Sequence, residues 1–154
     1  GARTDSHGPG PEAEALLQLR RSMHPAMEQH GTVLIEDVAV PRSQLGAMFR
    51  EVRRIEAERN VLIPTVAHAA DGNLHPNFIV PGETVPEHIW EAAGELFRSA
   101  LALGGTLTGE HGVGLLKKRW LGDELGDDQI ELHRGIKSVF DPMNILNPGK
   151  VFDA

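Results

Sequence analysis

The sequence of 154 residues contains no cysteine. This absence excludes disulfide bonds, iron–sulfur ligation and thiolate zinc sites within the chain. Any metal ion bound here must therefore be held by nitrogen and oxygen ligands.

Aromatic and basic residues are also scarce. The chain has no tyrosine, only 5% aromatic residues, and a formal net charge of −7 from 15 basic and 22 acidic side chains. A negative charge is the wrong sign for binding a phosphate backbone, and few rings are available to stack on bases. We therefore expect no nucleic-acid partner.

Long apolar runs are missing as well. No segment approaches the roughly 20 apolar residues that cross a bilayer, and the N-terminus GARTDSHGPGPE lacks the apolar centre of a signal peptide. We therefore expect no transmembrane segment and a cytoplasmic location. Residues 1–11, rich in glycine, proline and charge, indicate a flexible lead-in or a tag remnant, and residues 12–154 indicate one domain.

The residues that are present fit a folded domain, because 40% are hydrophobic and 24% are charged. The expected segments are a strand at 32–40, a helix from Ser43 to Asn60, strands at 61–68 and 74–80, a helix from Pro86 to Gly104, and a strand at 106–108. This order is that of a split βαβ pattern. We therefore predict an α+β fold, a ferredoxin-like (βαββαβ) antiparallel sheet with helices on one face. Pro76 indicates an edge strand or a bulge, since it has no N–H to donate.

Two helical segments flank this predicted sheet. The first begins near Glu12 and should be broken or kinked by Pro25. Its apolar stripe consists of Leu16, Leu19, Met23 and Met27. The second covers about 115–139, and the segment DPMNILNPGKVF (141–152) cannot continue it because of its Asp-Pro and Asn-Pro pairs.

The stretch HAADGNLH (68–75) places two histidines on either side of an Asp-Gly turn signal. A two-residue type I′ turn would set His68 directly opposite His75, with Cβ atoms about 4.5 to 5.5 Å apart and Asn77 on the same face. Two imidazoles at that separation can bind one metal ion, although a three-residue loop would shift the register by one. Two strand histidines held by ordinary hydrogen bonds are the alternative.

A third ligand is available in GTLTGEHGVG (105–114), where glycines permit backbone turns that direct Glu110 inward. Two histidines and one carboxylate with open coordination positions are typical of a catalytic divalent metal site. The neighbouring His111 could act as a base, since the reference pKa of histidine is about 6.5. A polar loop without metal is the alternative, and the glycine spacing does not match a nucleotide-binding motif.

Three segments, HAADGNLHPN, TGEHGVGLLKKRWL and DPMNILNPGKVF, together resemble the C-terminal region of FAD-linked 2-hydroxy acid dehydrogenases and oxidases of the vanillyl-alcohol oxidase type. That family includes the glycolate oxidase flavin subunit, D-lactate dehydrogenase and D-2-hydroxyglutarate dehydrogenase. The likeness extends from about Leu16 to Phe152. It implies a substrate-binding cap domain whose FAD is bound mainly by a separate domain. We expect that domain to be absent from this chain, and the chain to be inactive alone.

The resemblance also assigns roles to individual residues. It implies that His68, His75 and Glu110 bind a divalent ion, taken as zinc, and that His111 accepts a proton from the substrate. The implied reaction oxidises a 2-hydroxy acid to a 2-oxo acid, with hydride passing to FAD and an unidentified electron acceptor.

The remaining assignments concern the substrate and the flavin. The resemblance implies that Arg20 and Asn77 contact the substrate and that Asn147, in the NPGK segment, contacts FAD. Ile35 stands where the hydroxyglutarate-type members have a lysine for a distal carboxylate, and His24 stands where they have a threonine. A small substrate such as glycolate or D-lactate is therefore expected.

Two alternatives remain open on the sequence. The chain could be a non-catalytic ferredoxin-like module that binds a metal or a metabolite, or a purely structural domain whose histidines bind nothing. The basic run Lys117-Lys118-Arg119 could attract an anion, but a solvated helix face is the favoured interpretation.

Overall fold

The structure, a computed structural model, describes residues 8–152. Residues 1–7 of the predicted lead-in lie outside this range. Pro11, the last residue of the predicted lead-in, is the first residue of a helix. The elements are α1 (Pro11–Arg21), α2 (Met23–Glu28), β1 (Thr32–Ile35), β2 (Val38–Ala39), η1 (Arg42–Gln44), α3 (Leu45–Arg59), β3 (Thr65–His68), β4 (Asn73–Val80), α4 (Glu87–Ala102), η2 (Lys118–Trp120) and α5 (Leu121–Phe140).

The sheet is built around β4. Strands β1 and β2 pair with one side of β4 and β3 pairs with the other, all antiparallel. Beyond β2, Thr106 forms an antiparallel bridge with Ala39, so the predicted strand at 106–108 is reduced to one bridge. The spatial order is Thr106, β1/β2, β4, β3. This is the split βαβ order, and the α+β prediction is confirmed.

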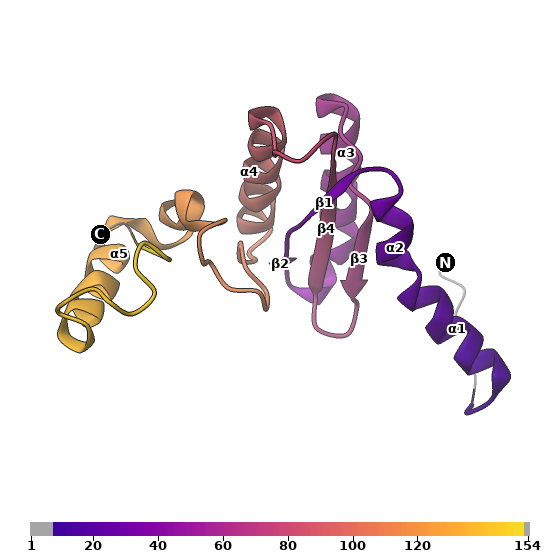
Figure 1. Cartoon of the computed structure of the whole chain (residues 1–154), viewed down its shortest axis with the longest axis horizontal. Helices are drawn as coiled ribbons and strands as arrows, with labels where there is room; N and C mark the ends of the chain where they lie inside the picture. The colour runs from indigo at the N-terminus through magenta and orange to yellow at the C-terminus, as the bar shows by residue number, and fades with distance from the viewer. Residues whose placement is uncertain (1–7, 153–154) are drawn as a thin grey trace.

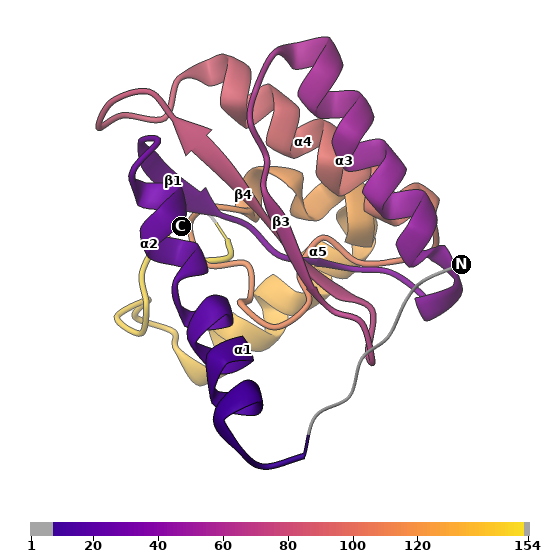
Figure 2. The same ribbon diagram turned by 90° about the vertical axis from the view of Figure 1, so that its right-hand side faces the viewer.

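Alternation along β4 separates a core face from a second face. Leu74, Phe78 and Val80 are fully buried, whereas His75 and Ile79 on the other face are only partly buried. Helices α3 and α4 pack side by side over the core face, and α1 and α2 lie on the other side of the sheet (Figures 1 and 2). The histidine-bearing face is therefore the one that the core helices leave accessible.

Pro76 lies in the central strand, so the prediction of an edge strand or bulge is wrong. Its carbonyl accepts a hydrogen bond from Glu36 N at 3.0 Å, but proline has no N–H to return the second bond of that pair. The ladder is interrupted at this point, where β1 ends at Ile35 and β2 begins at Val38. The gap leaves two acidic residues, Glu36 and Asp37, between the two short strands.

The helix boundaries follow the sequence with two corrections. Ser43 does not cap α3, because the chain enters the helix through η1 and no side-chain cap is formed. The stripe on the first helix is mostly not buried, since α1 buries none of its residues and Met27 is the one buried residue of α2. The predicted break does occur: α1 and α2 separate at Ser22, one turn before Pro25, whose ring would clash with the preceding turn.

The C-terminal end differs most from the core. Helix α5 begins at Leu121, later than predicted, and is interrupted at Gly126, whose φ of 70° is left-handed. It extends away from the sheet, on the opposite side of the molecule from α1 (Figure 1). The segment after Phe140 is not helical, as predicted. Among the described residues, no helix is both long enough and apolar enough to span a membrane.

Candidate metal centre

The turn that carries the two histidines is longer than predicted. His68 pairs with Asn73 instead of His75, so four residues (69–72) form the turn. Asp71 causes this, because its Oδ1 accepts the Asn73 N–H at 3.1 Å while His68 O accepts two amides of the turn. A register change of two residues preserves the face of every side chain. His68 and His75 are therefore diagonal neighbours on one face instead of direct opposites.

Gly72 fixes where this turn lies. Its φ is 89°, and its carbonyl accepts a hydrogen bond from Val40 N at 3.0 Å. A Cβ atom at this position would lie 2.1 Å from Val40 O, which is too close for any side chain. The hairpin end is thus held against the segment that follows β2, and only glycine fits there.

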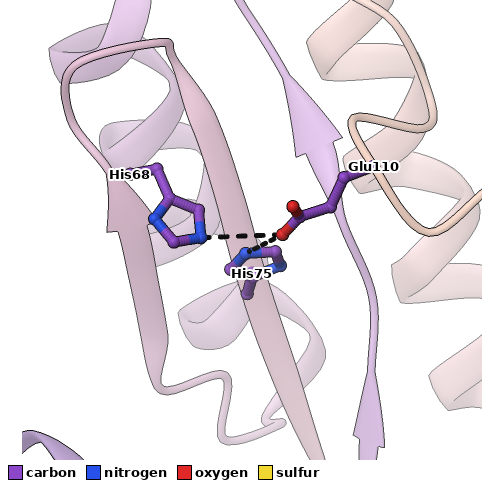
Figure 3. A group of neighbouring side chains, drawn as sticks. All are labelled: His68, His75 and Glu110. Atoms are coloured by element: carbon purple, nitrogen blue, oxygen red, sulfur yellow. Dashed lines mark ion pairs between the residues drawn. The ribbon is translucent and has the colours of Figure 1, made fainter.

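The three predicted ligands converge. His75 Nε2 lies 3.0 Å and His68 Nε2 lies 3.6 Å from Glu110 Oε1, and the three donor atoms all lie within 4.8 Å of one another. Figure 3 shows the two imidazoles of the hairpin and the carboxylate of the glycine loop directed toward one another. Residues that are 42 positions apart in the sequence, His68 and Glu110, thus meet at one point.

The donor set and its geometry fit a divalent ion such as zinc. Bonds of roughly 2.0 to 2.2 Å around one ion put neighbouring ligand atoms about 3 to 4 Å apart, and the two distances from Glu110 Oε1, 3.0 and 3.6 Å, lie in this range. Burial, with the neighbouring His111, lowers the pKa of His75 below 6.5, which favours the neutral imidazole that binds metal. The His68 and Glu110 side chains are 44% and 54% exposed, so the centre is open on its solvent side.

His111 stands beside the three ligands. Its ring is stacked on that of His75, with centroids 5.1 Å apart and planes at 17°, and its Nδ1 lies 3.8 Å from Asp37 Oδ1. The side chain is 42% exposed. His111 can therefore meet a substrate at the centre, as a proton-accepting residue must.

The loop that carries Glu110 and His111 is attached to Asp37. The Oδ2 atom of this fully buried carboxylate accepts the backbone N–H groups of Glu110 at 2.5 Å and of His111 at 3.1 Å. Lys117, at the far end of the loop, donates to Asp37 Oδ1 and Asp37 O. Lys117 is only 2% exposed, so the prediction of a solvated lysine is wrong for this residue.

Sequence reasoning missed Asp37, Glu36 and Lys117. Glu36 is 1% exposed, and neither of its carboxylate oxygens has a hydrogen-bond partner among the described residues. Burial raises its pKa to about 7 against the attraction of Lys117. One signal was available: the acidic pair interrupts the otherwise apolar strand TVLIEDVAV, where charged side chains are costly unless paired.

Arg20 faces the same region. A cavity of about 280 Å³ is lined by Arg20, Arg21, His24, His68 and His75, among others. Arg21 pairs with Glu14, whereas Arg20 has no ion-pair partner within the described part of the chain. The structure thus brings Arg20 to a cavity beside the histidines, where its guanidinium is available to an anion.

Asn77 and Asn147 are placed differently. The Asn77 side chain is buried, and its Nδ2 donates to Pro64 O at 3.0 Å and His75 O at 2.7 Å, so a substrate could meet only its Oδ1. Asn147 lies outside the centre, on the exposed segment after α5, where its Oδ1 accepts from Lys150 Nζ at 3.2 Å. Both assignments stay predictions.

Comparison with known proteins gives consistent matches. A family model described as FAD linked oxidases, C-terminal domain, matches residues 9–151. Glycolate oxidase subunit GlcD of Bacillus subtilis is 42% identical over 144 residues, which cover 92% of this chain and 31% of that protein. D-lactate dehydrogenase of Archaeoglobus fulgidus is 35% identical over 140 residues, covering 91% and 31%. The probable mitochondrial D-lactate dehydrogenase of Danio rerio is 39% identical over 119 residues, covering 76% and 24%. The chain spans a third or less of the length of these relatives.

Proposed function

Because the chain belongs to the family of C-terminal domains of FAD-linked oxidases, we propose that it is the substrate- and metal-binding part of a flavin-dependent dehydrogenase. The proposed reaction oxidises a small 2-hydroxy acid to the 2-oxo acid. Glycolate and D-lactate, which appear in the names of the relatives, are both acids of this class. The convergence of His68, His75 and Glu110 beside a basic cavity carries the proposal.

The chain supplies the ligands for a divalent ion and the groups that position the substrate. His68, His75 and Glu110 would hold the ion, and two nitrogen donors with one oxygen donor suit zinc. When bound, such an ion supplies Lewis-acid polarisation of the substrate oxygens. Arg20, at the edge of the same cavity, offers a guanidinium to the substrate carboxylate.

His111 accepts the hydroxyl proton of the substrate in this proposal. Its exposed ring lies next to the metal ligands without being one of the converging donors. When bound, FAD would supply the hydride-accepting chemistry. It would be held mainly by a part of the protein outside these residues, with Asn147 as the proposed contact from this chain.

Ile35 favours a substrate with a single carboxylate. This residue pairs with Asn77 across β1 and β4 and is 39% exposed, so it presents an apolar surface on the face that carries His75. An apolar side chain cannot pair with a second, distal carboxylate without leaving that charge unsatisfied. We therefore favour a short monocarboxylic substrate over a diacid.

The test uses the protein in its full natural length. Metal content is measured by elemental analysis without a histidine tag, and turnover with glycolate and D-lactate is followed by flavin reduction. His111→Ala should lower kcat by roughly 10²- to 10⁴-fold and leave the bound metal unchanged, whereas Glu110→Gln should lower both. Loss of metal in His111→Ala would make this residue a ligand. Metal binding without turnover would support the alternative function, a non-catalytic module that binds a metal or a metabolite.

A further inference from the structure

The glycine loop between Leu107 and Lys117 carries two functional side chains but has little packing of its own. Glu110 and His111 are both exposed, and Gly112 and Gly114 have φ values of 80° and 53°. A glycine-rich segment has many accessible backbone conformations, and fixing each residue costs roughly 1 to 2 kcal/mol of entropy. Val113 packs against the core, but residues 109–112 are exposed, so something other than apolar burial must hold this part of the loop in place.

Asp37 supplies that restraint at the middle of the loop. Besides the amides of Glu110 and His111 on its Oδ2, its Oδ1 accepts the Thr108 hydroxyl at 3.4 Å. These bonds fix the backbone on which the metal-binding carboxylate and the proton-accepting imidazole both stand. The ammonium of Lys117 lies against the same carboxylate, so the buried acidic group has a buried basic partner.

Lys117 restrains the two ends of the loop. Its ammonium donates to Leu107 O at 2.9 Å, to Asp37 O at 2.6 Å and to Asp37 Oδ1, so all three of its protons are used. Leu107 begins the loop and Lys117 ends it. One buried ammonium thus closes the loop and neutralises the carboxylate that holds its centre.

Gly109 adds a contact with the hairpin. A Cβ atom on this glycine would lie 2.2 Å from Asn73 Oδ1, so the loop lies directly against the first residue of β4. Asn73 is also the pairing partner of His68. The loop and the histidine hairpin are therefore in contact at the point where their ligands meet.

The geometry points to Asp37 and Lys117 as a positioning pair that sets the affinity of the metal centre and the placement of His111. This inference rests on the proposed function, because it assigns the pair to the same centre. Neither residue touches the converging donor atoms, so the pair acts on the metal centre through the backbone of Glu110. It acts on His111 through the backbone and through the contact of Asp37 Oδ1 with His111 Nδ1 at 3.8 Å. Outer contacts of this kind usually change metal affinity or activity by roughly 10- to 100-fold.

The decisive variant is Asp37→Leu combined with Lys117→Met, which removes both charges and leaves neither buried alone. In the full-length protein, its zinc dissociation constant, measured by competition with a chelating dye, should rise at least roughly 10-fold. Its kcat at saturating zinc should fall by a similar factor, with little change in KM for the 2-hydroxy acid. Asp37→Asn keeps an acceptor oxygen for the amides and should lie between wild type and the double variant. Glu87→Gln, an exposed carboxyl paired with Arg119, is the matched control and should change neither quantity.

A second measurement does not depend on metal or turnover. In metal-free wild-type protein, the Glu110 and His111 amides should exchange slowly with solvent deuterium, and Asp37→Asn should exchange them faster. Rapid exchange of both amides in wild type would overturn the inference even if the double variant did not fold. So would a folded double variant with wild-type zinc affinity and kcat. A wild-type protein that neither binds zinc nor turns over substrate would refute the proposed function, while amide exchange would still test the pair.

Discussion

The sheet with its two covering helices and the C-terminal end of the chain are stabilised in opposite ways. In residues 32–108, large apolar side chains such as Phe78 and Phe97 are fully buried between the sheet and helices α3 and α4. Helix α5 buries only Leu121. Its exposed apolar side chains are Leu132, Ile136, Val139 and Phe140.

Polar contacts hold the C-terminal end instead. The carboxylate of Asp141 forms an ion pair with Lys137. It also accepts hydrogen bonds from the backbone N–H groups of Ile145 and Leu146, at 3.0 and 2.9 Å. Lys137 donates a further hydrogen bond to Leu146 O. Where apolar burial fixes the backbone, polar side chains such as His75 are free for binding. Where polar contacts fix it, apolar side chains are left facing outward. On the proposed function, we expect the flavin-binding part of the protein to cover them.

The largest effect should come from removing a core ring. Phe78→Ala deletes a fully buried side chain between β4 and the core helices, and should lower the free energy of unfolding by about 3 to 5 kcal/mol. Urea unfolding followed by circular dichroism measures this value. A loss below about 1 kcal/mol would show that burial in this region is not what stabilises the chain.

Glu36 tests the cost of charge within the same region. Its pKa of about 7 exceeds the 4.5 of the unfolded chain, so between these values the folded state keeps a proton that the unfolded state has released. Stability should therefore fall as the pH rises from 4.5 to 7 and level off above 7. At about 1.4 kcal/mol for each pH unit, the loss is on the order of 3 kcal/mol.

Glu36→Gln isolates this contribution, since Lys117 and Asp37, the charged groups that face Glu36, remain in place. The free energies of unfolding of the two proteins should converge below pH 4.5 and differ at pH 8, with the variant more stable. Identical pH profiles for the two proteins would mean that Glu36 is not responsible.

The smallest effect should come from the exposed end. Ile136→Ser changes a half-exposed side chain on α5 and should alter the free energy of unfolding of this chain by no more than about 0.5 kcal/mol. The same urea titration used for Phe78→Ala measures it. A loss comparable with that variant would erase the contrast between the two regions.

Much of the fold could be predicted from local pattern. The alternation of buried and accessible residues along 74–80 and the apolar stripe of Met48, Val52 and Ile55 follow from the periods of strand and helix. The three ligands could also be predicted although the turn was assigned the wrong length. A register error of two residues leaves His68 and His75 on the same face, whereas an error of one would have separated them.

The rest depends on contacts that local pattern does not contain. Asp37 and Lys117 are 80 residues apart, and nothing near Lys117 distinguishes it from the lysine and arginine that follow it. The edge-strand rule for Pro76 failed because the sheet is interrupted opposite this residue, between β1 and β2, and omits the one bond to Glu36 that proline cannot donate.

Completing this sheet would not disturb the site. A valine in place of Pro76 would supply the N–H that proline lacks, and this donor would face Glu36. The register of β1 and β2 on β4 is the same on both sides of the gap, so Asp37 would keep its place and its carboxylate would still accept the amides of Glu110 and His111. Regular strand pairing and attachment of the loop are thus separate properties of neighbouring residues.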